Sequence, residues 1–489
     1  MGPHHTGPTL RRETATVYDP GPMEPAPPAP APAASPFALD AAVFAGAAAL
    51  VAVGFAAPEG LWAFPVRAIP AWAFPAGLTA ALALATAWAR FGPDDRPAVR
   101  LEPSAGRRAV TIGLALLLGF ALLWSLRCVK AYGDAGAIAG FIDRGVIFHK
   151  REPLSPALFL GVHEAVGRAV GWPPAHTIRV VNTVAGAIGL VVIAGLVRRL
   201  VPDARGARLA ATLALAGGGA VQLFAGYVEN YTVPAVLMLA SLSAGLDALA
   251  GRGGALRAYG LWTLSSMFHL SGLLFGPAMV WLAWHTTLGR DPRRLASRAI
   301  IGPLLVTLVP ALALYATMLA VGFLRAEEKG FGGGDGLMFV PLFDKTGMSQ
   351  YLFARPAHLL AVTNQQLLVA PLGLLVCALG LAAALPARRR AALVAPLGGP
   401  PPPTAVALVY VLLVAGAFWT LTVIWNPDLG ALRDWDLFGP LGFYLNAAAV
   451  SLVAAHLAPA PRRMTAALVV LAAANLSRGL PFVLHNAGW

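Results

Sequence analysis

Long apolar stretches, separated by short polar ones, run along the chain from Phe37 almost to its end. A helix crosses the ~30 Å hydrocarbon layer of a bilayer with about 20 apolar residues, so each stretch predicts one crossing. The stretch 258–287 is too long for one helix and holds Ser271-Gly272 in its middle, so we divide it near His269. The pattern predicts an all-α polytopic membrane protein with about thirteen crossings. They are expected at residues 37–57, 68–89, 109–127, 177–197, 209–226, 231–250, 258–268, 271–287, 299–324, 358–385, 404–425, 437–458 and 464–485.

Residues 1–36 differ from the rest of the chain, because they hold no apolar run and are rich in proline and alanine. Such a segment buries too little apolar surface to offset its ordering entropy, which predicts a disordered tail. The first apolar run begins near Phe37, too late and too long for a signal peptide, so the first membrane helix is expected to act as the export signal.

Composition excludes several classes of protein. Hydrophobic residues make up 57% of the chain and charged residues 12%, against roughly 25% charged residues in ordinary globular proteins. A soluble enzyme, a disordered protein and a fibre are thereby excluded. The two cysteines, Cys128 and Cys377, supply neither a disulfide framework nor a zinc site.

The net charge of +13 follows membrane topology. With the N-terminus in the cytoplasm and sides alternating, 22 of the 36 lysines and arginines fall inside and 14 outside. This is the positive-inside pattern, so no nucleic-acid partner is needed to explain the basic excess. The expected location is a bacterial-type inner membrane or plasma membrane. The scheme makes residues 128–176 one long outer segment.

That first outer segment predicts two helices lying in the membrane interface. Asp134 precedes the first, over 135–145, in which Ala137, Ile138, Phe141 and Ile142 recur at helical spacing. The second, over 153–171, follows His149-Lys150-Arg151-Glu152 and starts with Pro153. Its apolar face is expected to hold Leu154, Leu158, Val162, Val166 and Ala169, with His163, Glu164 and Arg168 elsewhere.

Two later outer segments are unusually polar. Residues 325–357 contain three glycines at 332–334 between charged residues, which predicts a mobile loop that could cover a substrate; no phosphate-binding motif is present there. Residues 425–436 place two tryptophans beside three acids. Tryptophan is common at the interface, which explains Trp425 and Trp435 but not the acids.

A set of motifs spans about residues 109–290: Asp134, the two helices after it, Arg179, the basic pair Arg198-Arg199, the block Gly226-Tyr227-Val228-Glu229-Asn230-Tyr231-Thr232, and Phe268-His269-Leu270-Ser271-Gly272. In these motifs the chain resembles the GT-C superfamily of membrane glycosyltransferases, which includes protein O-mannosyltransferases and lipid A aminoarabinose transferases. It implies a catalytic module over 109–298, after two additional helices over 37–108 and before further crossings over 299–489. The chain departs from the family in those two additional crossings, in having one acid at 134 where mannosyltransferases often have a pair, and in lacking a large C-terminal soluble domain.

The resemblance implies transfer of a sugar from a polyprenyl phosphate outside the cytoplasm to a protein or glycan acceptor. Such a reaction needs a base for the acceptor and positive charge for the departing phosphate. Asp134 is the expected base, and Lys150, Arg151 and His269 are expected to bind the phosphate. Glu229 is expected to share a divalent metal ion with Asp134 or to orient the acceptor. Residues expected to contact the substrate are Tyr227, Asn230, Tyr231, Asp434 and Asp436.

Plainer roles stay open for several of these residues. Asp134 could be the N-cap of the helix that follows it, and Glu229 an ordinary boundary residue. Lys150 and Arg151 could contact lipid headgroups, and His269 could be a satisfied core residue.

A secondary transporter or a lipid-linked oligosaccharide flippase is the alternative function. Transporters place ionisable groups near the midplane and often have repeated halves, whereas the acids here cluster in outer loops and no repeat is visible.

Overall fold

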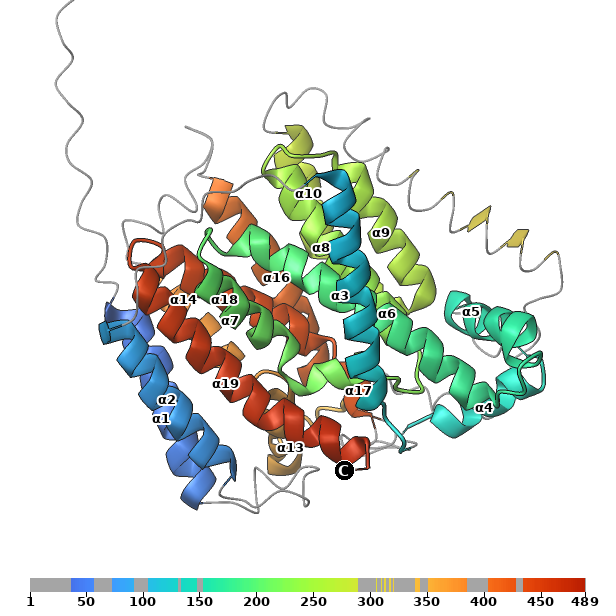
Figure 1. Cartoon of the computed structure of the whole chain (residues 1–489), viewed down its shortest axis with the longest axis horizontal. Coiled ribbons are helices and arrows are strands. Elements are labelled where there is room, and N and C mark those ends of the chain that lie inside the picture. Colours follow the sequence, from blue (N-terminus) through green and yellow to red (C-terminus); the bar gives the residue numbers. More distant parts are fainter. Residues whose placement is uncertain are drawn as a thin grey trace, which may run out of the picture. The chain divides into compact units, whose positions relative to one another are not determined.

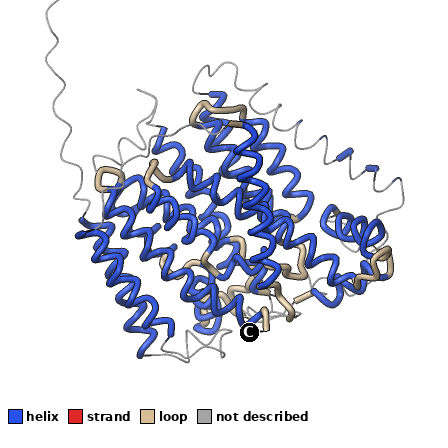
Figure 2. The backbone as a smooth tube through the Cα atoms, viewed as in Figure 1, coloured by secondary structure: helices blue, strands red, loops and turns tan. Residues whose placement is uncertain are grey.

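The computed structural model describes residues 37–56, 73–91, 104–130, 133–146, 153–288, 339–343, 351–384, 403–427 and 434–488, with a few isolated positions between 305 and 320. Helices make up most of these residues, and among them only Phe339 and Trp425 form a β-bridge (Figure 2). The α-helices are α1 (Phe37–Ala56), α2 (Ala73–Phe91), α3 (Ala105–Ser125), α4 (Ala135–Asp143), α5 (Leu154–Val162), α6 (Pro174–Leu200), α7 (Arg205–Ala216), α8 (Thr232–Leu249), α9 (Ala255–Phe268), α10 (Gly276–Ala283), α13 (Pro356–Val369), α14 (Gly373–Ala384), α16 (Pro403–Ile424), α17 (Trp435–Phe438), α18 (Leu441–Leu457) and α19 (Pro461–Asn486). The 3₁₀ helices Gly219–Phe224 and Leu270–Phe275 follow α7 and α9, and the π-helical turns His163–Gly167 and Trp284–Leu288 extend α5 and α10.

Six helices of the described residues are long and apolar enough to cross a membrane, and a seventh span results if the bent pair α13 and α14 counts as one. The six are Ala105–Ser125, Pro174–Leu200, Thr232–Leu249, Ala405–Ile424, Trp435–Leu457 and Pro461–Asn486. The chain is therefore an all-helical integral membrane protein. The total of about thirteen crossings remains a prediction, because the expected crossing 299–324 lies almost entirely outside the described residues.

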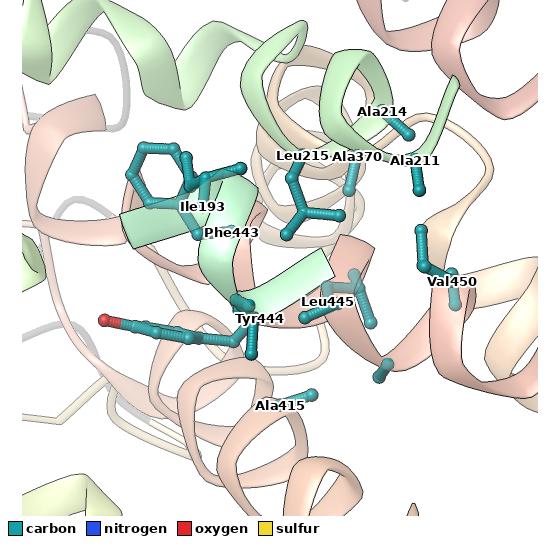
Figure 3. Packing of buried hydrophobic residues seen from close by; sticks show 14 of the residues in the cluster. Ile193, Ala211, Ala214, Leu215, Ala370, Ala415, Phe443, Tyr444, Leu445 and Val450 are labelled. Atoms are coloured by element: carbon teal, nitrogen blue, oxygen red, sulfur yellow. The ribbon is translucent and has the colours of Figure 1, made fainter. Parts of the chain in front are cut away.

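Helix α18 forms the centre of the bundle. Its candidate span, which begins at Trp435, is 94% buried, whereas that of α3 is 11% buried. Figure 3 shows Phe443, Tyr444, Leu445 and Val450 of α18 among side chains from the surrounding helices. In contrast, Leu117 and Leu118 of α3 are 64% and 68% exposed, the pattern of a peripheral helix that faces lipid.

Small and polar residues hold neighbouring helices together, as expected where lipid weakens the hydrophobic drive for helix association. Gly479 of α19 lies so close to the backbone of Gly217 and Gly218 that a β-carbon there would collide with it. Asn475 Nδ2 of α19 donates to the carbonyl of Ala214 in α7 over 2.6 Å. This packing coincides with the end of α7, so the predicted crossing 209–226 consists of a 12-residue helix and a separate 3₁₀ helix.

The two N-terminal helices pack on the C-terminal part of the chain. Figure 1 shows α1 and α2 side by side, and α2 makes extensive contact with α19. Helix α1 packs on α14 and α19 as well. The predicted tail 1–36 lies outside the described residues.

Helices α4 and α5 occupy the two positions where the sequence predicts interfacial helices, although the structure does not test their place in a membrane. The buried face of α4 is Ala135, Ile138, Phe141 and Ile142, whereas Ala137, which was predicted on this face, is exposed. In α5 the inner face contains Phe159 and Leu160, because these side chains pack with α4 and α6. The predicted apolar face from Leu154 to Ala169 is half-buried or exposed, which leaves it available to lipid.

Candidate functional site

The polar loops that the sequence assigns to one side of the membrane are joined to each other at one end of the bundle. The amide of Cys128, after α3, donates to the carbonyl of Ala225 over 2.8 Å, and the amide of Val129 donates to the carbonyl of Asn486 at the end of α19 over 2.9 Å. Gln365 Nε2 of α13 donates to the carbonyl of Trp435 over 3.2 Å. These bonds bring residues 126–130, 133–146, 225–231, 351–366, 425–427, 434–438 and 485–488 to the same end, where Figure 1 shows α4, α13 and α17.

Asp134 meets Glu229 at this end. The backbone amide of Asp134 donates to Glu229 Oε1 over 2.9 Å, across 95 positions of sequence. Asp134 occupies the N-cap position of α4, but its side chain makes no capping hydrogen bond to the helix. Asp134 is exposed to the surface. The side chain is therefore not committed to the capping role that the sequence left open.

Glu229 is only 5% exposed, in the loop between the 3₁₀ helix Gly219–Phe224 and α8. Burial raises the pKa of its carboxyl well above the usual range, and the negative charges of Asp436 and Asp134 raise it further. The amides of Asp134 and Asn230 oppose this rise in pKa without cancelling it. Three carboxyl groups from different parts of the chain thus interact electrostatically, and Glu229 holds its proton more tightly than an ordinary glutamate.

Helix α6 supports the loop that carries Glu229 through hydrogen bonds. Asn182 Nδ2 donates to the carbonyls of Tyr227 and Glu229 over 2.6 and 2.9 Å, and Asn182 itself is fully buried. Gly226 starts the loop with φ +58°, and a β-carbon there would lie 3.0 Å from Thr183 Oγ1 and 3.2 Å from the β-carbon of Arg127. Only glycine accepts both this φ and these close neighbours without strain.

Aromatic side chains join the Glu229 loop to α17. The rings of Tyr227 and Trp435 meet edge to face with centroids 5.2 Å apart, and Trp435 packs in the same way on Phe482 of α19 at 4.9 Å. Burial raises the pKa of the Tyr227 phenol, so this residue stays a neutral hydroxyl and is no candidate for the base. Trp435 and Asp436 are buried, whereas Asp434 is half-buried at the N-cap position of α17.

His269 lies where α9 ends, at the break that the sequence predicts. Its Nδ1 accepts from the amide of Ser271 over 3.0 Å and so caps the following 3₁₀ helix. The imidazole is 7% exposed and packs on the ring of Tyr231 with centroids 4.5 Å apart. Ser155 of α5 donates to the carbonyl of Phe268 over 2.9 Å and lies 3.4 Å from the carbonyl of Asn230. The structure thus gives His269 a local structural role; the phosphate-binding role expected from the sequence remains a prediction.

Basic residues for which the sequence predicts no catalytic or binding role lie next to Gly226, at the start of the loop that carries Glu229. Arg127, Lys130 and Arg179, which we call the basic triad, surround Cys128: Arg179 Nε donates to the carbonyl of Cys128 over 3.0 Å. The charges of Lys130 and Arg179 both reach the Cys128 thiol, but burial still raises its pKa to about 11, so the thiol supplies no negative charge. Lys130 Nζ also lies 2.5 Å from His485 Nε2.

Among the described residues, no carboxylate forms an ion pair with any member of the basic triad. Three cations that pair with no carboxylate of the described residues form a suitable site for an anionic ligand at this end of the bundle. In the sequence, Arg127 and Lys130 could have been recognised as the charges at the end of the crossing 109–127 and just after it. Lys150 and Arg151, which the sequence proposes for the phosphate, lie outside the described residues.

The donor set for a metal ion is sparse. In the part of the chain that the structure describes, no group of three or more His, Cys, Asp and Glu side chains could hold a metal ion. Asp134 and Glu229, the pair that the sequence proposes as shared ligands, are joined through a backbone amide. A bond of that kind requires no metal.

No protein-family model matches the sequence, and neither does any curated protein compared with it. Solved structures with a similar arrangement include ArnT from Cupriavidus metallidurans bound to undecaprenyl phosphate, at 14% identity over 79% of this chain and 78% of that chain, with a TM-score of 0.43. Others are oligosaccharyltransferase AglB from Archaeoglobus fulgidus in complex with an inhibitory peptide and a dolichol-phosphate, at 12% identity over 78% and 56% with a TM-score of 0.44, and arabinosyltransferase EmbB from Mycobacterium smegmatis, at 17% identity over 78% and 34% with a TM-score of 0.42. All three are GT-C glycosyltransferases, the superfamily that the sequence motifs resemble. The likeness is weak, so the function has to rest on this chain's own residues.

Proposed function

We propose that this protein is a membrane glycosyltransferase that moves a sugar from a polyprenyl-phosphate donor to a protein or glycan acceptor on the extracytoplasmic face. The observation that carries the proposal is the pairing of Asp134 with Glu229, in a loop that starts beside the basic triad at Gly226. A base and a cluster of positive charges at the same end of a lipid-embedded bundle are the two groups that this reaction needs.

In the proposed reaction, Asp134 takes the proton of an acceptor hydroxyl. The acceptor oxygen attacks the anomeric carbon of the sugar, and the bond from that carbon to the phosphate oxygen breaks. Its electron pair leaves with the polyprenyl phosphate, whose growing negative charge is stabilised by Arg127, Lys130 and Arg179. The transition state resembles an oxocarbenium ion, so a nearby carboxylate also stabilises the positive charge on the sugar.

Glu229 has a different part from Asp134 in this scheme. Two interacting carboxyl groups separate into one that is charged and one that keeps its proton. The buried Glu229, with its raised pKa, keeps the proton, while the exposed Asp134 carries the charge and acts as the base. Glu229 positions Asp134 through the hydrogen bond to its amide.

The test is a transfer assay on the full chain in lipid nanodiscs with a panel of undecaprenyl-phosphate sugars. Asp134→Asn is expected to lower transfer at least a hundredfold, on the order of the usual effect of removing a general base. Asp143→Asn is the matched control, because Asp143 is an exposed acid at the other end of the same helix. Equal activity of wild type and Asp134→Asn would refute the role of Asp134. Solute transport into liposomes that survives Asp134→Asn would favour a transporter instead.

A further inference from the structure

The two arginines of the basic triad are held by neutral acceptors. Arg127 Nη1 donates to the carbonyl of Trp124 over 3.1 Å, and its guanidinium lies over the Trp124 ring, 4.9 Å from the centroid. Arg179 Nε donates to the carbonyl of Cys128 over 3.0 Å. A neutral acceptor fixes the place of a cation and leaves its charge in force, whereas a carboxylate would cancel the charge. Both arginines are therefore held in a form that suits an anionic ligand.

Lys130 is held in the same way, but by a side chain from a distant part of the chain. Its Nζ lies 2.5 Å from His485 Nε2, across 355 positions of sequence. A lysine ammonium has three N–H donors and no acceptor, so Lys130 donates and Nε2 accepts. The imidazole of His485 is thus neutral, with its proton on Nδ1. This bond uses one N–H group of Lys130, and the other two can bind a ligand.

The last turn of α19, which carries His485, is fixed against the segment that carries Lys130. The amide of Val129 donates to the carbonyl of Asn486 over 2.9 Å, and Asn486 is fully buried. Phe482, one turn earlier in the same helix, is buried as well. His485 itself is half-buried. Its backbone is therefore held in place by its neighbours, so its imidazole can fix a flexible side chain.

Holding Lys130 before a ligand arrives favours binding. Lysine has one of the largest rotamer entropies of any side chain, and a ligand that has to order such a side chain loses part of its affinity. His485 orders Lys130 when the protein folds, so the ligand meets a group that is already in place. Without His485 we expect affinity to fall about fivefold, less than on removing the charge of Lys130 itself.

We propose that His485 is a positioning residue for the phosphate of the polyprenyl donor, and that its neutral imidazole holds Lys130 in the place where the ammonium binds this phosphate. That the ligand is the donor's phosphate rests on the proposed function. That His485 fixes Lys130 rests on the contact between the two side chains.

The test is isothermal titration calorimetry on the full chain in phosphatidylcholine nanodiscs, with geranylgeranyl phosphate as the probe and geranylgeraniol as its counterpart without phosphate. His485→Leu is expected to weaken binding of the phosphate about fivefold and to leave binding of the alcohol unchanged. His485→Gln is expected to bind the phosphate within about twofold of wild type. Glutamine Oε1 is an acceptor as many bonds from the backbone as histidine Nε2, so it can hold Lys130 in the same way.

A double-mutant cycle separates positioning from a merely structural role. If His485 acts through Lys130, His485→Leu should cost no further affinity in a Lys130→Gln background. A structural role would lower affinity equally in both backgrounds. In the transfer assay, His485→Leu should raise the donor KM about fivefold while kcat stays within about twofold of wild type, because Lys130 keeps its charge.

His456→Leu is the matched control. His456 is also a half-buried histidine in the last turn of a helix, α18, and its Nδ1 donates to the carbonyl of Leu452 in that helix over 2.9 Å. Its phosphate affinity should equal that of wild type. Asp134→Asn is expected to bind the phosphate normally, so failure of the transfer proposal and failure of this one are separable.

Three results would overturn the proposal: wild-type affinity in His485→Leu, equal weakening by His485→Gln and His485→Leu, or an undiminished loss in the Lys130→Gln background. Equal affinity of wild type for the phosphate and for the alcohol would overturn it as well.

Discussion

Glu229 Oε1 accepts a hydrogen bond from the backbone amide of Asp134 over 2.9 Å, so the loop that follows the 3₁₀ helix Gly219–Phe224 fixes the start of α4. The bond uses the main chain of Asp134 and leaves its carboxyl group for other contacts. Glu229 is buried, and the bond therefore couples its protonation state to the position of the proposed base.

Replacing Glu229 with glutamine is expected to change how stability depends on pH. Below the ordinary glutamate pKa of 4.5, folded and unfolded chains both hold the proton. Above it the unfolded chain releases the proton while the folded chain keeps it, so wild type loses stability with rising pH until the raised folded pKa is reached. Each unit of pKa difference corresponds to about 1.4 kcal/mol.

Glu229→Gln removes this contribution, so its melting temperature is expected to fall less steeply than that of wild type between pH 5 and pH 8. Differential scanning fluorimetry in detergent measures both curves. Glu164→Gln is the control, because Glu164 is exposed and pairs only with Arg168 in an i,i+4 bridge of 3.1 Å. Parallel curves for wild type and Glu229→Gln would mean that the buried carboxyl is ionised in the folded protein.

Asn182→Leu is expected to reduce both stability and transfer. The amide supports the carbonyls of Tyr227 and Glu229, which become unsatisfied in the variant; two such losses amount to roughly 2–4 kcal/mol. The loop that positions Asp134 is then loosened, so kcat should fall by more than tenfold at temperatures where the variant remains folded.

The control is Asn475→Leu, which removes one comparable bond, to the carbonyl of Ala214 between α19 and α7. It is expected to lower the melting temperature while kcat stays within about twofold of wild type, because its bond lies between helices and not in the Glu229 loop. If both variants lowered kcat to the same extent, the effect of Asn182 would be one of general stability.

A comparison of Gly226→Ala with Gly251→Ala separates the effect of close packing from that of backbone conformation. Both Gly226, at φ +58°, and Gly251, at φ +71°, adopt the left-handed region, and alanine costs about 1 kcal/mol there. A β-carbon at Gly251 would meet nothing within 4 Å, whereas one at Gly226 would press on Thr183 and Arg127. Thermal melts should therefore show a larger loss for Gly226→Ala than for Gly251→Ala, and only the former should lower transfer. Equal losses would show that the site tolerates the added carbon.

Much of the architecture could be predicted from hydrophobic periodicity, because the length of an apolar run is set by the membrane and needs no knowledge of tertiary partners. The break at His269 was visible as a run too long for one helix, and it occurs where α9 ends. The interruption after α7 was missed, because Gly217 and Gly218 do not break the apolar run in the sequence. They act through contact with Gly479, which lies 262 and 261 positions further along the chain.

For the candidate site, the sequence predicted only that its loops lie on the same side of the membrane. Alternation of crossings predicts that segments containing Asp134, Glu229 and Asp436 share a side, but periodicity holds no information about which atoms meet. The bond from a backbone amide to Glu229, the exposed state of Ala137 and the contact of Lys130 with His485 depend on packing between helices far apart in sequence.

The basic triad leads to the last prediction. Lys130→Gln keeps the length and polarity of the side chain and removes its charge, which should weaken contact with a phosphate while leaving the acids in place. The KM for the polyprenyl-phosphate donor is expected to rise about tenfold, with a smaller dependence on salt concentration than in wild type. Steady-state kinetics in nanodiscs at two salt concentrations measure both effects.

Arg168→Gln is the control, since Arg168 is exposed and pairs with Glu164, and its donor KM should match wild type. An unchanged donor KM in Lys130→Gln would remove Lys130 from the proposed phosphate site. A loss of kcat at constant KM would instead assign its charge to the transition state alone.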